Sequence, residues 1–477
     1  MKRFLRLVPA ALLVVALAAC TPREQTLVLL STNDIHAKIQ RFPALATAVA
    51  ACRDTMPATV LLDAGDRWTG NAYVDLAPTP GMPVIALMNR LGYDAVTFGN
   101  HEFDHGQAFL GRLLDSMAFE VVCANVVSDT CTFPQVPPYV ILERDGLRIG
   151  VVGAVTNYEG PGHPAGHTAS FAGLEFPDPQ QRAMECAAAL RPEVDVLVLV
   201  SHMGHDRDIE LLGRETRYDV VIGGHTHEEI DTMVNGTLLT QTGKNLQNVG
   251  VTTIRLRGRK VVGADFRLVS LDGYAPDTAY RAEVDRCYAD ERLNRPVGTF
   301  AAQADKTGLA NWMAAAVARS ARAEVGIYHV GGVRLDSIPA GGVGVARVYD
   351  LEPFGTEIAA MRMTPRQLER MIVTKYNEAT REGHRLDMVA TTPYEIVVDS
   401  ADNAVGVRFP QLREGRSYRV ALSDYIFKNY HGLEYADGMI TGVKVADVLL
   451  DELEKNSPVE PDNMLRQHIV RDGTKPL

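Results

Sequence analysis

The chain has 477 residues, more than one hydrophobic core usually organises, so two domains are expected. Hydrophobic residues make up 46% and charged residues 22%, which is the balance of a soluble globular protein. The net charge of −11 at pH 7 argues against a general nucleic-acid-binding protein, which would present a basic face, so no nucleic-acid polymer is expected as a partner.

The first twenty residues predict a targeting segment. Lys2, Arg3 and Arg6 form a basic region, and the apolar run over 7–19 is too short for a comfortable membrane span. Small residues lead into Cys20, which resembles a lipoprotein signal and implies that 1–19 are removed and Cys20 is lipidated as the mature N-terminus. The alternative is an ordinary signal peptide followed by an accidental cysteine. We expect an exported protein at the periplasmic face or outer membrane, attached to the membrane only through this lipid.

Apolar runs and amphipathic stretches alternate from residue 26 to residue 271. Continuous apolar runs predict strands buried on both faces, and the stretches between them predict helices, as in a layered α/β sheet. Residues 140–152 predict a hairpin, and residues 250–269 predict a closing pair of strands. The other predicted strands are 27–30, 60–62, 94–98, 194–200 and 219–222, with helices near 42–53 and 83–91.

The remaining chain predicts a linker helix and a second, smaller domain. Residues 272–295 are charged and helix-prone, and Pro296 follows them. The second domain is expected over 296–477. Its predicted elements are helices near 310–323 and 365–377 and strands at 394–399 and 418–422.

Nearly every apolar strand of the first domain ends in a short cluster of Asp, Asn, His and Gly. Loops beyond the carboxyl ends of strands gather at one edge of an α/β sheet, where ligands bind. An Asn-His pair alone could cap a helix, and a lone His-x-His is usually unimportant, but the joint occurrence predicts a site for zinc- or manganese-type ions. The clusters are 33–36, 63–66, 99–104, 201–204, 223–227 and 240–243.

These clusters resemble the motif set of the calcineurin-like metallophosphoesterases, and more narrowly that of the bacterial 5′-nucleotidases. The resemblance covers about residues 27–271 and, more loosely, the second domain to about residue 437. It implies an α/β protein with a four-layer αββα metallophosphoesterase domain over 26–271 and a smaller α/β 5′-nucleotidase C-terminal domain that binds the substrate. The motifs, in the family's order, are Asp34-x-His36, Gly65-Asp66-x-x-x-Gly70, Gly99-Asn100-His101-Glu102-Phe103-Asp104, Ser201-His202-x-Gly204 and Gly224-His225-x-His227.

The resemblance also implies roles for these residues and two divalent metal ions, Zn or Mn. Asp66 would bridge the ions, and a metal-bound hydroxide would be the nucleophile. His101 would donate to the phosphoryl group or the leaving oxygen, oriented by Asp104; the alternative is that this pair only packs beside the site. The other implied ligands are Asp34, His36 and His227 for one ion, and Asn100, His202 and His225 for the other.

In the resembled family, the second domain stacks the nucleoside base between two aromatic rings. Gly331-Gly332-Val333-Arg334 is similar to a family turn, so Arg334 could hold the phosphate side. Phe354 and Tyr425 are the stacking candidates, although each alone could equally be a core residue. A simple alignment replaces the family's ribose-binding Asp with Leu433, so the specificity pocket departs from the family while the metal motifs are complete.

The expected function is therefore a dimetal phosphoesterase that hydrolyses nucleotides in the manner of a 5′-nucleotidase. A 2′,3′-cyclic-nucleotide phosphodiesterase/3′-nucleotidase or a UDP-sugar hydrolase would share this metal site and remains the alternative. A non-catalytic surface-binding lipoprotein is the least favoured function, because it would have lost ligands or His101, and every motif position is filled.

Overall fold

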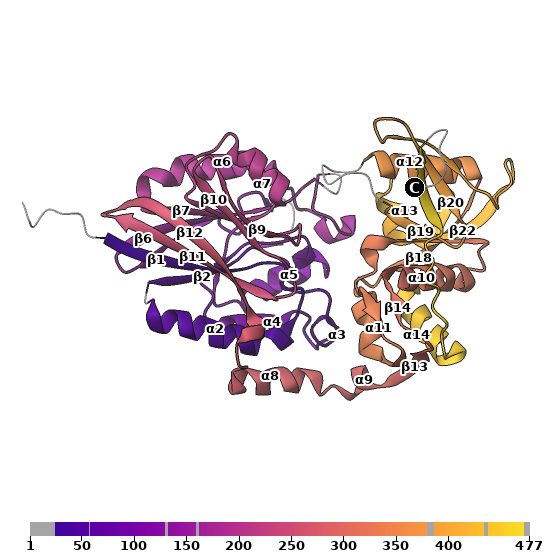
Figure 1. The fold of residues 1–477 in the computed structure, drawn as a ribbon, viewed down its shortest axis with the longest axis horizontal. Coiled ribbons are helices and arrows are strands. Elements are labelled where there is room, and N and C mark those ends of the chain that lie inside the picture. The colour runs from indigo at the N-terminus through magenta and orange to yellow at the C-terminus, as the bar shows by residue number, and fades with distance from the viewer. Residues whose placement is uncertain are drawn as a thin grey trace, which may run out of the picture.

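The computed structural model describes residues 24–56, 58–128, 132–158, 162–378, 386–433 and 437–471. These residues form an N-terminal and a C-terminal part, connected along one flank by helices α8 (Thr278–Tyr288) and α9 (Glu291–Asn294) (Figure 1). Cys20 and the predicted targeting segment lie outside the described residues. Within the described ranges, no helix has the length and apolar character needed to cross a membrane.

The N-terminal part contains two six-stranded sheets whose inner faces pack against each other. Leu29 and Leu62 of one sheet share a buried cluster with Ile149 and Val198 of the other, which explains why these strands are apolar along their length. The first sheet is β12 (Lys260–Ser270), β11 (Asn248–Arg257), β1 (Glu24–Thr32), β2 (Thr59–Asp63), β3 (Ala95–Val96) and β4 (Glu120–Val121), in spatial order. The second is β5 (Tyr139–Arg144), β6 (Leu147–Val155), β7 (Val196–His202), β8 (Val220–Ile222), β10 (Thr237–Thr242) and β9 (Glu229–Val234).

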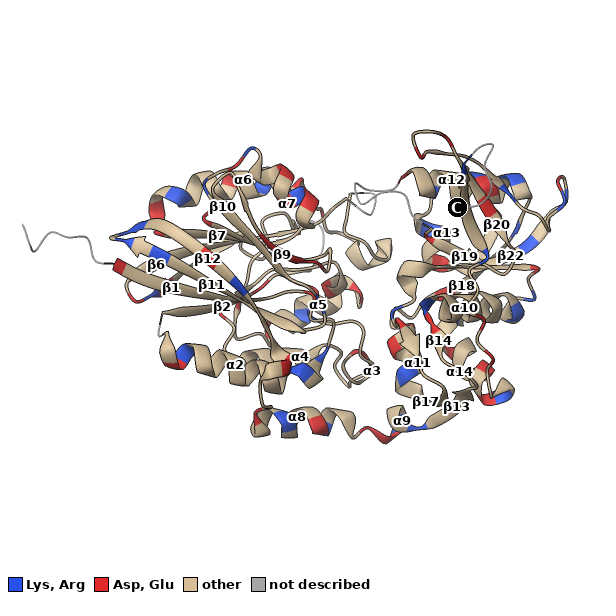
Figure 2. Ribbon diagram, in the orientation of Figure 1, with Lys and Arg blue, Asp and Glu red and all other residues tan. Residues whose placement is uncertain are grey.

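Helices cover the outer faces of both sheets. The first sheet is covered by α2 (Phe42–Thr55), α4 (Met82–Leu91), α5 (Gln107–Leu114) and α8, and the second by α6 (Pro179–Leu190) and α7 (His205–Leu212). Residues of both charge signs lie on α6 and α8, whereas the charged residues of α2 are confined to its C-terminal end (Figure 2). The predicted four-layer αββα arrangement is confirmed.

Parallel pairing brings the strand ends together. β1, β2 and β3 pair in parallel, and so do β6, β7, β8 and β10. β3 is shorter than the predicted 94–98, and the backbone then reaches Gly99, whose N–H donates to Glu102 Oε2 at 2.5 Å. The carboxyl end of each parallel strand is therefore followed by a loop at one edge of its sheet.

The C-terminal part is built on a five-stranded sheet. Its strands are β19 (Met388–Ala390), β15 (Val325–His329), β22 (Tyr418–Ser423), β18 (Glu357–Met363) and β23 (Gly438–Lys444), in spatial order. One face is covered by α10 (Lys306–Ser320), α11 (Val345–Leu351) and α14 (Val445–Asn456). The other is covered by α12 (Pro365–Asn377), α13 (Asp424–Asn429) and the small sheet β21 (Ala404–Arg408), β20 (Tyr394–Val398) and β24 (Gln467–Arg471).

The connecting elements are short. The segment predicted as a linker helix contains two helices, because the side chain of Asp290 accepts the N–H of Arg292 and caps a new helix.

The remaining short elements lie in both parts of the chain. The N-terminal part also has α3 (Ala72–Asp75). The C-terminal part begins with two small pairs, β13 (Pro296–Phe300) with β17 (Gly341–Gly344), and β14 (Ala304–Asp305) with β16 (Ser337–Ile338).

Gly326 allows α10 to lie directly on β15, because a Cβ at this position would overlap the carbonyl oxygen of Ala314. We expect Gly326→Ala to lower the free energy of unfolding by about 1–3 kcal/mol, the usual cost of overpacking. Gly342→Ala is the matched control, because a Cβ there meets nothing within 4 Å. Urea unfolding of both variants measures the difference, and equal stabilities would contradict this account of the contact.

Candidate functional site

The predicted metal ligands lie in the loops at the carboxyl ends of the parallel strands. Asp34 and His36 follow β1, Asp66 follows β2, and Asn100 follows β3. His202 is the last residue of β7, while His225 and His227 follow β8. Five of these residues have a left-handed backbone, which costs a non-glycine residue roughly 1–2 kcal/mol and is typical of functional sites. They are Asp34, His36, Asp66, His225 and His227.

Asp34, His36 and His227 form one compact group. The Nε2 atom of His227 lies 3.4 Å from Asp34 Oδ1, and that of His36 lies 3.8 Å from the same oxygen. The two Nε2 atoms are 2.9 Å apart. Asp34 and His36 are buried while His227 is partly exposed, so the group opens toward one side. Three donor atoms this close together can hold one metal ion.

Asp66 connects this group to a second one. Its Oδ2 lies 3.2 Å from His202 Nε2, and Asp34, Asp66 and His202 all have donor atoms within 4.8 Å of one another. The Nδ1 of His202 donates to the carbonyl oxygen of Ala64 at 2.7 Å, which leaves Nε2 directed at Asp66. The ring of His225 lies 5.2 Å from that of His202, and its backbone N–H donates to Asp34 Oδ2 at 3.0 Å.

The electrostatics of the group favour positive charge. Burial would raise the pKa of Asp66, but the neighbouring His202 and His101 outweigh burial and hold that pKa well below its usual value. Burial would lower the pKa of His202, but the carboxylate of Asp66 outweighs burial and raises that pKa to about 10. The buried carboxylates of Asp34 and Asp66 therefore attract cations, either protons on the neighbouring imidazoles or metal ions.

The donor set fits divalent metal ions. Carboxylate, imidazole and amide oxygen donors are the ligands of zinc- and manganese-type ions. The Oδ1 of Asn100 is buried and has no hydrogen-bond partner among the described residues. Buried polar atoms rarely lack a partner, so this atom points to coordination of an ion.

His101 and Asp104 form a hydrogen-bonded pair beside the metal ligands. They lie on the short turn that begins at His101, and His101 Nδ1 is 2.8 Å from Asp104 Oδ2. The Nε2 of His101 is 3.9 Å from Asp66 Oδ2. Burial would lower the pKa of His101, but the charges of Asp104 and Asp66 outweigh burial and raise that pKa. A histidine with a raised pKa is suited to donate a proton.

Two of the predicted substrate residues of the C-terminal part reach this cluster. Arg334 Nη2 donates to His36 Nδ1 at 3.4 Å, and its guanidinium lies 5.6 Å from the centre of the Phe354 ring. The Phe354 ring stacks on the ring of His101, with centroids 5.7 Å apart and an angle of 20° between the planes. The candidate site therefore lies between the two parts of the chain.

Tyr425 has other ring neighbours, which the sequence did not identify. It stacks on His329 with centroids 4.8 Å apart, and the ring of His167 meets it edge-on at 6.5 Å. His329 ends the apolar strand β15, so the strand-end rule that found the metal ligands could have found it as well. Leu433, at the position of the family's ribose-binding Asp, is buried in the core of the C-terminal part.

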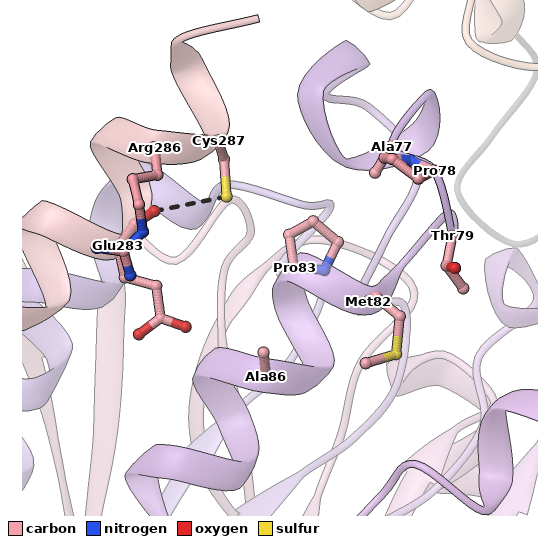
Figure 3. Close-up of a pocket in the computed structure, with 9 residues that line it drawn as sticks. All are labelled: Ala77, Pro78, Thr79, Met82, Pro83, Ala86, Glu283, Arg286 and Cys287. Carbon is pink, nitrogen blue, oxygen red and sulfur yellow. Dashed lines mark hydrogen bonds between the residues drawn. The ribbon is translucent and has the colours of Figure 1, made fainter.

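A separate hollow of about 470 Å³ lies between helices α4 and α8 (Figure 3). Its lining is mainly apolar, and Cys287 Sγ on its wall donates to the carbonyl oxygen of Glu283 at 3.6 Å. Its lining residues belong to none of the groups of metal-binding side chains found among the described residues. The strand-end cluster therefore remains the candidate site.

Comparison with known proteins agrees with the geometry. The family model for calcineurin-like phosphoesterases matches residues 27–229, and the model for the 5′-nucleotidase C-terminal domain matches residues 290–437. The chain is 23% identical to a 5′-nucleotidase of Vibrio cholerae over 96% of this chain and 97% of that protein. It is 25% identical to the trifunctional nucleotide phosphoesterase YfkN of Bacillus subtilis over 90% of this chain but only 34% of that longer protein.

Among solved structures, a 5′-nucleotidase precursor of Thermus thermophilus is similar with a TM-score of 0.80 and 20% identity, covering 94% of this chain and 99% of that one. At this identity the likeness supports the fold, while the two family models cover the metal motifs and most of the C-terminal part. The chain therefore belongs to the family of phosphoester hydrolases that joins a calcineurin-like phosphoesterase domain to a 5′-nucleotidase C-terminal domain.

Proposed function

We propose that this chain is a metal-dependent phosphomonoesterase that releases phosphate from nucleotides, as a 5′-nucleotidase does. One observation carries the proposal: Arg334 and Phe354 of the C-terminal part lie directly against His36 and His101 of the metal cluster. A cation and an aromatic ring are thus held beside a cluster that attracts divalent ions. That combination suits a phosphate attached to an organic group.

Seven side chains would hold two ions of the Zn or Mn class, with Asp66 shared between them. When bound, such ions lower the pKa of a coordinated water, so that it can attack phosphorus, and neutralise charge on the phosphoryl oxygens. The remaining ligands would be Asp34, His36 and His227 at one ion and Asn100, His202 and His225 at the other. The close group of Asp34, His36 and His227 supports the first set, and the contact between Asp66 and His202 supports the second.

The other residues would act on the phosphate ester itself. Arg334 would bind the phosphoryl oxygens through its guanidinium. His101 would donate a proton from Nε2 to the leaving oxygen, because Nδ1 is held by Asp104. Phe354 would cover the organic group next to the leaving oxygen, and Tyr425, which already stacks on His329, would provide a second ring surface.

One observation favours the alternative substrates. Leu433 packs in the core, so this position supplies no acid to recognise a ribose hydroxyl. A 2′,3′-cyclic nucleotide, a 3′-nucleotide or a UDP-sugar could then compete with AMP at the same metal cluster. The name of the related Bacillus protein, a trifunctional nucleotide phosphoesterase, says that this longer relative acts on nucleotide phosphoesters in more than one way, which supports testing these esters.

The proposal extends to organisation and location. The phosphoesterase domain would span 26–271, a linker 272–295 and the substrate-binding domain 296–477. Residues 1–19 would be a lipoprotein signal, and lipidated Cys20 would anchor the exported enzyme at the cell envelope. Its substrate would therefore be an extracytoplasmic nucleotide.

A substrate panel tests the proposed activity. Metal-free, lipid-free protein starting at Thr21 is supplied with Mn²⁺ or Zn²⁺, and the released products are separated and measured by chromatography, because opening of a cyclic diester or cleavage of a UDP-sugar liberates no inorganic phosphate. The panel contains AMP, ADP, ATP, UMP, 3′-AMP, 2′,3′-cyclic AMP, UDP-glucose and an aryl phosphate. We expect the 5′-mononucleotides to give the highest kcat/KM. Preference for the cyclic or sugar esters would select the alternative, and no release from any ester would reject a phosphoesterase function.

His101→Ala should lower kcat by about two to four orders of magnitude, because it removes a proton donor and a positive charge next to the leaving oxygen. The metal content should stay at the wild-type level, as measured by atomic absorption. His105→Ala is the control: His105 is exposed and contacts Phe109, so this variant should keep wild-type turnover. Normal turnover of His101→Ala would remove His101 from the mechanism.

Asp66→Asn should lower the metal content and, with it, kcat, because an amide cannot supply the charge of a shared carboxylate. Metal per chain is measured after dialysis against buffer without free ions. Asp178→Asn serves as control, since Asp178 caps the distant helix α6 and should leave metal content unchanged. Full retention of both ions by Asp66→Asn would contradict the bridging role.

A further inference from the structure

We propose that Glu102 is a positioning residue for the metal ions: its buried carboxylate fixes the two loops that carry Asp66 and Asn100, and so sets the affinity for the ions. The proposal rests on the function proposed above, because it assumes that these loops hold metal. It concerns a residue that is neither a ligand nor in contact with substrate in that scheme.

Both oxygens of Glu102 accept backbone N–H groups from the metal-binding loops. Oε2 accepts the N–H of Asp66 at 2.9 Å and that of Gly99 at 2.5 Å. Oε1 accepts the N–H of Arg67 at 2.8 Å. The side chain is buried, so water does not compete for these bonds. One carboxylate therefore joins the loop after β2 to the loop after β3.

Asp66 makes the reverse connection. Its Oδ1 accepts the N–H of His101 at 2.8 Å, while its own N–H is held by Glu102. Each loop thus contributes a carboxylate that binds the backbone of the other. A displacement of either loop would break bonds at both ends, so the positions of Asp66 and Asn100 are coupled.

The backbone around Asp66 needs such support. Asp66 has a φ of 57°, in the left-handed region that disfavours residues with a Cβ. The loops also approach closely: a Cβ at Gly99 would overlap the carboxylate of Asp66, and a Cβ at Gly65 would overlap the backbone of Gly99. Without the bonds from Glu102, the backbone of Asp66 would be free to relax, and its carboxylate would leave the position between His36 and His202.

The negative charge of Glu102 is balanced by a buried arginine rather than by metal ions. Arg67 Nη2 lies 3.6 Å from Glu102 Oε1, and Arg67 Nη1 lies 3.3 Å from Asp63 Oδ1 and donates to the Thr97 carbonyl at 2.6 Å. All three charged side chains are buried. Glu102 is therefore committed to backbone amides and to Arg67, which is the arrangement of a supporting group behind the ligands.

Metal titration of the full metal-free chain tests this role without measuring turnover. Glu102→Gln replaces one acceptor oxygen with an NH₂ that faces backbone donors. We expect Mn²⁺ binding, followed by calorimetry, to weaken by about 10–100-fold for at least one ion, the usual effect of losing a supporting group. In the metal-free protein, we also expect faster hydrogen exchange in peptides covering 65–67 and 99–101 than in wild type.

Glu215→Gln is the matched control. Glu215 is also buried, and its Oε1 accepts the backbone N–H of Arg217 at 2.8 Å and the Nε–H of the same residue at 3.0 Å. It precedes β8, at the opposite edge of the sheet from the metal loops. We expect this variant to lose stability in thermal melts but to keep wild-type Mn²⁺ affinity.

Two outcomes would overturn the proposal: wild-type Mn²⁺ affinity in Glu102→Gln, or an equal loss of affinity in Glu215→Gln. If Glu102→Gln does not fold, Glu102→Asp provides the measurement, because an aspartate keeps the charge but is too short to reach all three amides. Unchanged Mn²⁺ affinity in Glu102→Asp would also overturn the proposal. A wild-type chain that binds no Mn²⁺ would instead reject the proposed function, while a chain that binds Mn²⁺ but hydrolyses no ester would leave the role of Glu102 intact.

Discussion

The structure depends on keeping two carboxylates, Asp34 and Asp66, buried close together. Burying an uncompensated charge costs several kcal/mol even after relaxation, so the surroundings must supply donors and positive charge. The backbone N–H of His225 and the imidazoles of His202, His36 and His227 do so here. The requirement explains why this edge of the molecule is rich in histidine and why its backbone is held in left-handed conformations that only a rigid scaffold sustains.

The four-layer fold supplies that scaffold. Two sheets packed face to face bring the ends of β1, β2 and β3 next to the ends of β7 and β8, so ligands from both sheets meet. The C-terminal part then covers the cluster, and its placement is supported by direct contacts. The carboxylate of Asp350 accepts the N–H of Ala72 at 2.8 Å, and Tyr73 Oη donates to Asn294 at 2.5 Å. Arg334 reaches His36 because α3 and α11 are held together in this way.

Local sequence was sufficient for the strands and for the edge of the sheets at which the candidate metal ligands gather, because both follow from short-range rules. An apolar run such as 196–200 can only be a buried strand or helix, and its length selects a strand. The ligands then follow directly after the strands. The stacking of Phe354 on His101 and of Tyr425 on His329 could not be derived, because it depends on how the two parts meet and on side-chain directions, which leave no periodic pattern. The role of Glu102 could not be derived for a similar reason: the sequence places an acid inside a metal motif but does not show which groups its carboxylate binds.

The distribution of charge across the site bears on the kind of molecule it accepts. At one end, buried Asp34 and Asp66 attract metal ions, and Arg334 adds a fixed cation facing them. At the other end, burial lowers the pKa of His329 to about 4, so its imidazole is neutral at physiological pH and stacks on Tyr425 without adding charge. Phe354 lies against His101 and Arg334. Under the function proposed above, a complementary molecule would carry an anionic phosphate for the metal cluster and Arg334 and an uncharged ring system for the aromatic side chains, as a nucleotide does.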